Sequence, residues 1–169
     1  GLWNKHSNFE EATRTPLIFK SPDLDGGFVN DSPVELLDIF PTVCTLAGIP
    51  KPDDLDGISL VPILEKKSEY LRDFAISQYP RRCNVMRSVI GRYPDDCTLM
   101  GYAVRNEKYR YIAWVSGDFE DRSDFYNDEI VMEELYDYEI DPLETKSYAS
   151  DASYQKVKEG MIKDLRSVI

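Results

Sequence analysis

The sequence predicts an α/β chain in two parts. Residues 1–69 are expected to form the carboxyl-terminal end of a larger α/β domain, and residues 70–169 a small α+β subdomain. Three observations predict this: four segments with strand character follow residue 70, a tight turn near Glu107 separates the middle two, and a helical apolar stripe closes the chain. With 169 residues, 42% of them hydrophobic, the chain can bury a core.

The expected subdomain is an antiparallel sheet with one helix across a face. The predicted strands span residues 73–79, 101–106, 109–115 and 133–138. Alternation in the third places Tyr109, Tyr111, Ala113 and Val115 on one face, and Arg110, Ile112 and Trp114 on the other. A helix over 152–168, capped by Ser150 or Asp151, carries an apolar stripe of Tyr154, Val157, Met161, Leu165 and Val168.

The first part is expected to contain one strand and one helix. The apolar run of residues 15–20 predicts a short buried strand. A capping box at residues 32–35 would place Pro41 inside a helix, at a cost of about 3 kcal/mol. A helix over 39–47 with Asp38 as its cap avoids that cost and ends at Gly48.

The charge and hydrophobicity of the chain argue against some classes of protein, and its first residues suggest how it arises. The chain has 31 acidic and 20 basic residues, a net charge of −11, which disfavours nucleic acid as a partner. No apolar run approaches the roughly 20 residues that span a bilayer. The chain opens at Gly1 without Met or a signal peptide, so a processed product or a fragment of a longer protein is expected.

The cysteines leave two interpretations open. Cys83 and Cys97 flank a loop-like stretch, whereas Cys44 lies in an apolar run. One bridge between Cys83 and Cys97 with one buried thiol would indicate a secretory or lysosomal route. Three free thiols in a cytosolic protein is the alternative. Metal-ligand spacing is absent from the sequence, which has one histidine, His6.

Two segments are candidates for chemistry. Residues 3–11 contain Lys5 and His6, for which composition alone favours an ordinary polar surface over a functional role. Residues 78–94 contain four arginines and no acid within a strongly acidic chain. That stretch is either a solvated loop or an anion-recognition loop, because guanidinium groups match carboxylate, sulfate and phosphate oxygens. The four arginines are Arg81, Arg82, Arg87 and Arg92.

The chain resembles the type I sulfatase family along nearly its whole length. Residues 1–19 resemble the family segment that follows a metal-binding Asp-His pair, and later matches occur at residues 38–42, 46–50, 56–60, 134–137 and 141–142. Ser77-Gln78-Tyr79-Pro80-Arg81, residues 100–105 and 109–111, and Trp114 are similar to the iduronate-2-sulfatase subgroup. The resemblance implies an alkaline-phosphatase-like α/β domain followed by a small carboxyl-terminal sheet with a helix.

The resemblance also implies roles for individual residues. Lys5 matches the family lysine that contacts the sulfate, where it would neutralise oxygens as charge develops. Arg81 matches the subgroup's substrate pocket by motif. Arg92 matches a uronate-binding residue by distance alone, with Arg82 and Arg87 as competitors. His6 replaces a variable residue and is expected to support the site indirectly.

The parts that the chain lacks are expected before Gly1. These are a formylglycine nucleophile, Ca²⁺ and the metal ligands, so residues 1–169 are expected to hold no metal and to be inactive alone. The expected partner is the amino-terminal catalytic portion of the same protein. The expected substrate is a sulfated, uronate-containing glycosaminoglycan, met in a lysosome or outside the cell. The alternatives are a non-catalytic anion- or glycan-binding module, and a phosphatase or phosphodiesterase on the same scaffold.

Overall fold

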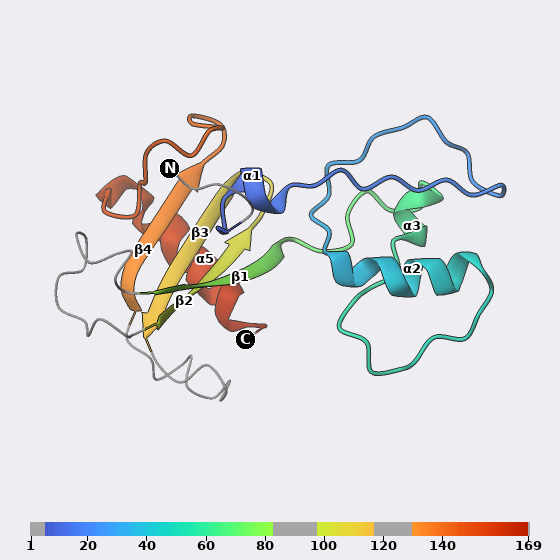
Figure 1. Cartoon of the computed structure of the whole chain (residues 1–169). Helices are drawn as coiled ribbons and strands as arrows, with labels where there is room; N and C mark the ends of the chain where they lie inside the picture. Colours follow the sequence, from blue (N-terminus) through green and yellow to red (C-terminus); the bar gives the residue numbers. More distant parts are fainter. Residues whose placement is uncertain (1–5, 83–97, 117–129, 169) are drawn as a thin grey trace. The chain divides into compact units, whose positions relative to one another are not determined.

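The computed structural model of the chain describes residues 6–82, 98–116 and 130–168. These residues form two compact units (Figure 1). The first unit combines residues 6–15 with those that follow Ala75, and the second consists of Pro16–Ala75. The division into residues 1–69 and 70–169 stays a prediction, because it concerns a larger catalytic domain.

The first unit is built on a four-stranded sheet. Its strands follow one another in sequence order and are β1 (Ala75–Arg82), β2 (Thr98–Arg105), β3 (Tyr109–Ser116) and β4 (Ile130–Asp137). The pairs β2–β3 and β3–β4 are antiparallel, and a register shift between Trp114 and Val115 marks a bulge in the second pair. All four predicted strands are confirmed, with boundaries that differ by no more than three residues.

The alternation predicted for β3 determines what covers each face of the sheet. Ile112 and Trp114 pack with Phe9 of the amino-terminal segment, which includes the short helix α1 (Glu10–Thr13). The helix α5 (Gln155–Arg166) contacts β2 and β3 and buries Met161 and Leu165 (Figure 1). The central strand is therefore buried on both sides.

The carboxyl-terminal helix begins as predicted but ends earlier. The 3-10 helix η3 (Ala152–Tyr154) precedes α5, and the carboxylate of Asp151 accepts a hydrogen bond from the backbone N–H of Ser153 at 2.9 Å. Asp151, rather than Ser150, is thus the cap. The expectation that Val168 continues the buried stripe is wrong: α5 ends at Arg166, and the Val168 side chain is 56% exposed.

The second unit contains three short helices and loops. They are η1 (Leu36–Asp38), α2 (Ile39–Leu46) and α3 (Val61–Leu64). The predicted helix over 39–47 is confirmed, and Gly48 follows it with φ +65°. The predicted strand at 15–20 is wrong, since no described strand lies beside it to pair with its backbone and the Ile18 side chain is 87% exposed.

Asp38 lies at the predicted N-cap position of α2, but its side chain holds other parts of this unit together instead of capping the helix. Its side chain is fully buried and makes no capping bond to α2. One carboxylate oxygen accepts bonds from the Ile58 N–H at 2.9 Å and the Arg72 guanidinium at 2.5 Å, and the other accepts from the Glu35 N–H at 2.8 Å. Asp38 therefore connects the turn before α2 with the loop that contains Ile58 and with the Arg72 side chain. Cys44 is a free, buried thiol, as expected.

No helix in the described ranges is both long and apolar enough to cross a membrane.

Two glycine substitutions should change stability in opposite directions. A Cβ at Gly57 would lie 2.1 Å from the Leu37 carbonyl oxygen, so Gly57→Ala should lower the free energy of unfolding by about 2 kcal/mol or more. Gly160 lies inside α5 with open space around its Cβ position, so Gly160→Ala should raise that free energy by about 0.5–1 kcal/mol. Thermal unfolding of the full-length protein checks both, and an unchanged midpoint for Gly57→Ala would contradict the close approach.

Candidate functional site

Asn8 fastens the amino-terminal segment to the sheet. Its side chain is 2% exposed, and its amide donates to the Gly101 carbonyl of β2 at 2.8 Å. The amide oxygen accepts from the Ser77 hydroxyl of β1 at 3.3 Å, and the Asn8 backbone carbonyl accepts from Arg110 of β3 at 2.5 Å. One buried asparagine therefore links the segment to three neighbouring strands.

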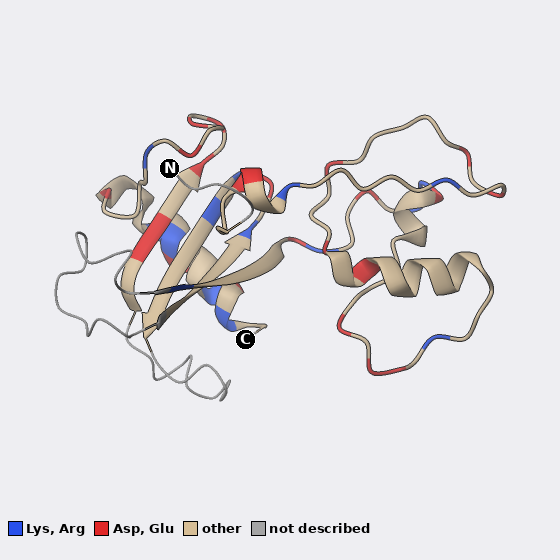
Figure 2. Cartoon of the chain, in the orientation of Figure 1, with Lys and Arg blue, Asp and Glu red and all other residues tan. Residues whose placement is uncertain are grey.

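A buried group of charges completes this attachment. The Arg110 guanidinium is 2% exposed and pairs with Glu10 of α1 at 2.5 Å and with Glu144 at 2.8 Å. Arg105 also pairs with Glu10, at 3.1 Å, and the Tyr138 hydroxyl donates to Glu144 at 2.6 Å. Figure 2 shows the acidic residues of α1 beside basic positions of β2 and β3. Unpaired charges would be costly here, and each has partners.

These contacts shift the pKa values of both charged partners. Burial opposes ionisation of Glu10, but its hydrogen bonds and charge pairing with Arg105 and Arg110 outweigh burial and lower its pKa. Burial likewise opposes the charge of Arg110, while Tyr138, Glu144 and Glu10 raise its pKa. Glu10 and Arg110 therefore both stay ionised at neutral pH.

His6 and Arg81, two of the residues that the sequence selects, lie together at the edge strand β1. The His6 ring is hydrogen-bonded to the Tyr79 hydroxyl through Nδ1, and the two rings meet edge to face with centroids 5.7 Å apart. The Arg81 guanidinium donates to the His6 carbonyl oxygen at 3.5 Å and lies 5.5 Å from the centre of the Trp114 ring. A cation and an imidazole are thus adjacent at one edge of the sheet.

Trp114 also takes part in a series of side-chain hydrogen bonds on the same face of the sheet. Its indole N–H donates to the Glu134 carboxylate at 2.6 Å, and the Tyr136 hydroxyl donates to the other oxygen of Glu134. Burial and the neighbouring Glu134 raise the pKa of Tyr136, so the hydroxyl remains protonated and keeps donating.

The remaining sequence-selected positions fall outside what the structure describes. Arg82 ends β1, but its side chain is not among the described groups. Lys5, Arg87, Arg92, Cys83 and Cys97 also lie outside the described residues, so their roles and the bridge stay predictions.

Sequence reasoning missed Asn8, Ser77 and Glu134 as supporting residues. Asn8 and Ser77 lie in the two segments that carry the resemblance, but their polar side chains resemble ordinary surface residues until their partners are known. Glu134 shares a face of β4 with Tyr136, and that alternation is the one signal that could have indicated its contact with Trp114.

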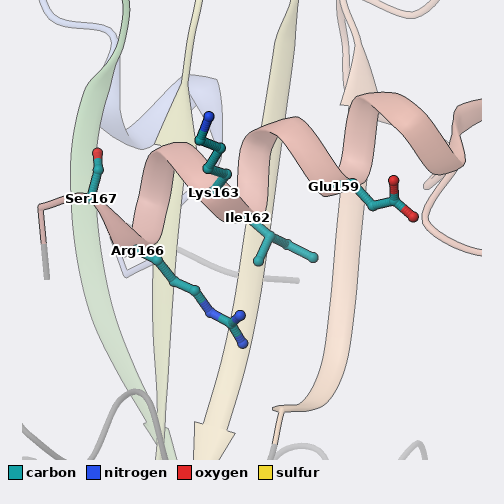
Figure 3. A pocket seen from close by; sticks show the side chains of 5 residues that line it. All are labelled: Glu159, Ile162, Lys163, Arg166 and Ser167. Atoms are coloured by element: carbon teal, nitrogen blue, oxygen red, sulfur yellow. The ribbon is translucent and has the colours of Figure 1, made fainter.

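An open hollow lies on α5. Figure 3 shows its lining of Glu159, Ile162, Lys163, Arg166 and Ser167. The lining mixes both signs of charge and includes no sequence-selected residue. In the described ranges, no three His, Cys, Asp or Glu side chains gather closely enough to hold a metal ion. At β1, the Arg81 guanidinium is a group of the kind that can bind an anion.

The ion pairs of Glu10 should make the free energy of unfolding depend on pH in the acid range. Because the folded-state pKa of Glu10 lies below its ordinary 4.5, its contribution is complete above about pH 4.5 and is lost as the pH falls through the folded value. Glu10→Gln should lower the free energy of unfolding at neutral pH by about 2 kcal/mol and reduce its slope at acid pH. Denaturant unfolding of the full-length protein at several pH values measures both. The exposed neighbour variant Glu11→Gln is the control, and equal slopes for the two variants would contradict the assignment.

The comparisons with known proteins agree with this fold. The chain is 33% identical to arylsulfatase K of Danio rerio over 117 residues, which are 67% of the chain and 20% of the relative. It is 30% identical to the Δ4,5-hexuronate-2-O-sulfatase of Bacteroides thetaiotaomicron, covering 90% of the chain and 28% of the relative. It is 27% identical to mouse iduronate 2-sulfatase, covering 91% and 36%. The chain thus spans about a quarter of the length of these relatives.

A solved structure shows the same architecture. A protein in complex with its substrate D-glucosamine-2-N,6-O-disulfate superposes with a TM-score of 0.53 and 26% identity, over 77% of this chain and 22% of that one. The family model described as N-sulphoglucosamine sulphohydrolase, C-terminal, matches residues 1–169. With the sheet, the closing helix and the matched length in agreement, the chain belongs to this family of sulfatase carboxyl-terminal domains.

Proposed function

We propose that the chain is the carboxyl-terminal part of a sulfatase that hydrolyses sulfate esters on a uronate-containing sulfated glycosaminoglycan. The observation that carries the proposal is the family match over the whole chain. The choice of a uronate is supported by the relatives named for hexuronate and iduronate sulfates. Arg81, which lies beside His6 and pairs with no carboxylate of the described ranges, is the described group best suited to an anionic sugar.

Within this proposal, residues 1–169 supply one side of the active site. Lys5, directly before the anchored residue His6, would stabilise charge that develops on the sulfate oxygens. Formylglycine would supply the nucleophile and Ca²⁺ would neutralise sulfate charge, and both would come from the part preceding Gly1. The described residues of this chain include no cluster of ligands for the metal.

An exposed apolar stripe on the second unit supports the need for a further part. Leu36, Phe40 and Val43 follow one another at helical spacing along η1 and α2, and their side chains are 67%, 54% and 50% exposed. Large apolar side chains grouped on one side of a helix are typical of a surface that another element covers. We propose that the amino-terminal catalytic portion covers this stripe and that the chain is inactive alone.

The proposed location is the lysosome or the outside of the cell. It rests on the predicted Cys83–Cys97 bridge, since disulfides persist in oxidising compartments.

Lys5→Ala tests the proposed division of the active site. Removing one preorganised charge should lower the kcat of the full-length protein on a chromogenic aryl sulfate by about 10²-fold or more. Lys20→Ala, which changes an exposed lysine, should leave kcat unchanged. Full activity without the Lys5 ammonium, or turnover by residues 1–169 alone, would contradict the proposal.

Arg92→Gln tests the choice of a uronate. Loss of a guanidinium that meets a carboxylate should raise the KM for a uronate 2-sulfate by about tenfold and leave a neutral aryl sulfate unchanged. Arg82→Gln and Arg87→Gln are measured alongside, and the variant that affects the uronate substrate alone identifies the carboxylate-binding residue. Equal losses on both substrates for all three variants, or a preference for a sulfated glucosamine, would count against the uronate.

A further inference from the structure

Arg81 differs from three other arginines of the described residues, because it forms no ion pair with a carboxylate there. Arg72, Arg105 and Arg110 each form an ion pair with a carboxylate. Within the described ranges no carboxylate pairs with Arg81, and its buried Nε has no hydrogen-bond partner. A guanidinium that no described carboxylate neutralises remains able to bind an anion that arrives from solution.

The Trp114 indole is the main contact that orients Arg81. The guanidinium carbon lies 5.5 Å from the ring centre, within the range of a cation–π interaction. The hydrogen bond to the His6 carbonyl is 3.5 Å long, at the outer limit for such a bond, and contributes less. A carboxylate would cancel the charge of the guanidinium. The face of an aromatic ring attracts the guanidinium but leaves its charge in place.

The ring itself is held from several sides. Trp114 is 2% exposed, and its N–H is bonded to Glu134 at 2.6 Å, which the Tyr136 hydroxyl also contacts. On the paired strand, Gly101 leaves the space that the ring fills, because a Cβ there would lie 2.7 Å from a ring carbon. The indole can therefore neither turn nor slide without breaking these contacts.

We propose that Trp114 is a positioning residue that holds the Arg81 guanidinium ready for an anionic group of the substrate, a carboxylate or a sulfate. The inference rests on the proposed function for the identity of the substrate. In this proposal, the hydrogen bonds that link Tyr136, Glu134 and Trp114 affect anion binding indirectly, because they hold the ring that orients Arg81.

The test is a double-mutant cycle on anion affinity in the full-length protein. Calorimetry measures the Kd for glucuronate and, separately, for inorganic sulfate in the wild type, Trp114→Leu, Arg81→Gln and the double variant. Trp114→Leu should weaken binding of one of these anions by about fivefold, and the anion affected identifies the group that Arg81 binds. The same change should have no further effect once Arg81 is Gln. Trp114→Phe, which keeps an aromatic face, should fall between Leu and Trp, and completes the cycle if the Leu variant does not fold.

Tyr111→Phe is the matched control. Its hydroxyl donates to Glu133 at 2.8 Å on the opposite face of the sheet, so this variant loses a similar buried bond without touching Arg81. Its Kd values should equal those of the wild type. A wild type that binds neither anion, or a Trp114 effect that persists without the Arg81 guanidinium, would overturn the inference. Intact anion binding without any sulfatase turnover would instead refute the proposed function alone.

Discussion

The arrangement of the first unit depends on the ion pairs and the hydrogen bond that the buried Arg110 guanidinium forms. It holds the Asn8 carbonyl, Glu10 and Glu144 at once, across about a hundred residues of sequence. Burying a charge costs several kcal/mol unless partners compensate, and removal of one partner from a buried pair costs about 3–5 kcal/mol. The arginine and its acids therefore require one another, and the amino-terminal segment cannot leave the sheet without exposing the sheet's core to an unpaired charge.

That requirement links structure to the proposed chemistry. In the segment that Arg110 anchors, His6 directly follows Lys5 in the sequence, and the same face of the sheet carries Trp114 with the Arg81 guanidinium over its ring. The sheet thus serves as a rigid support for groups that come from separate stretches of the chain. Sites whose groups lie on well-packed elements bind more tightly, because less conformational freedom is lost on binding.

The sequence predicted local features well because their causes are local. The alternation of β3 assigned Arg110 and Trp114 to one face, and Gly48 ended α2 in the left-handed conformation. What covers a surface is not a local property, so the apolar run around Ile18 predicted burial that the described residues do not provide. The Glu10–Arg110 pair was likewise invisible, since charge counts show no partner a hundred residues away. The resemblance predicted roles for His6 and Arg81, which stay predictions, and the structure added the contacts that hold the two side chains.

Hydrogen exchange tests most directly whether Arg110 fixes the amino-terminal segment. The Glu10 N–H donates to Glu144, and those of Ala12 and Thr13 donate to the Phe9 carbonyl. In the full-length protein these amides should exchange as slowly as the core of β3, and in an Arg110→Gln variant they should exchange fast while the β3–β4 pairing stays protected. Unchanged protection of residues 10–13 without the guanidinium would contradict the central role given to this arginine.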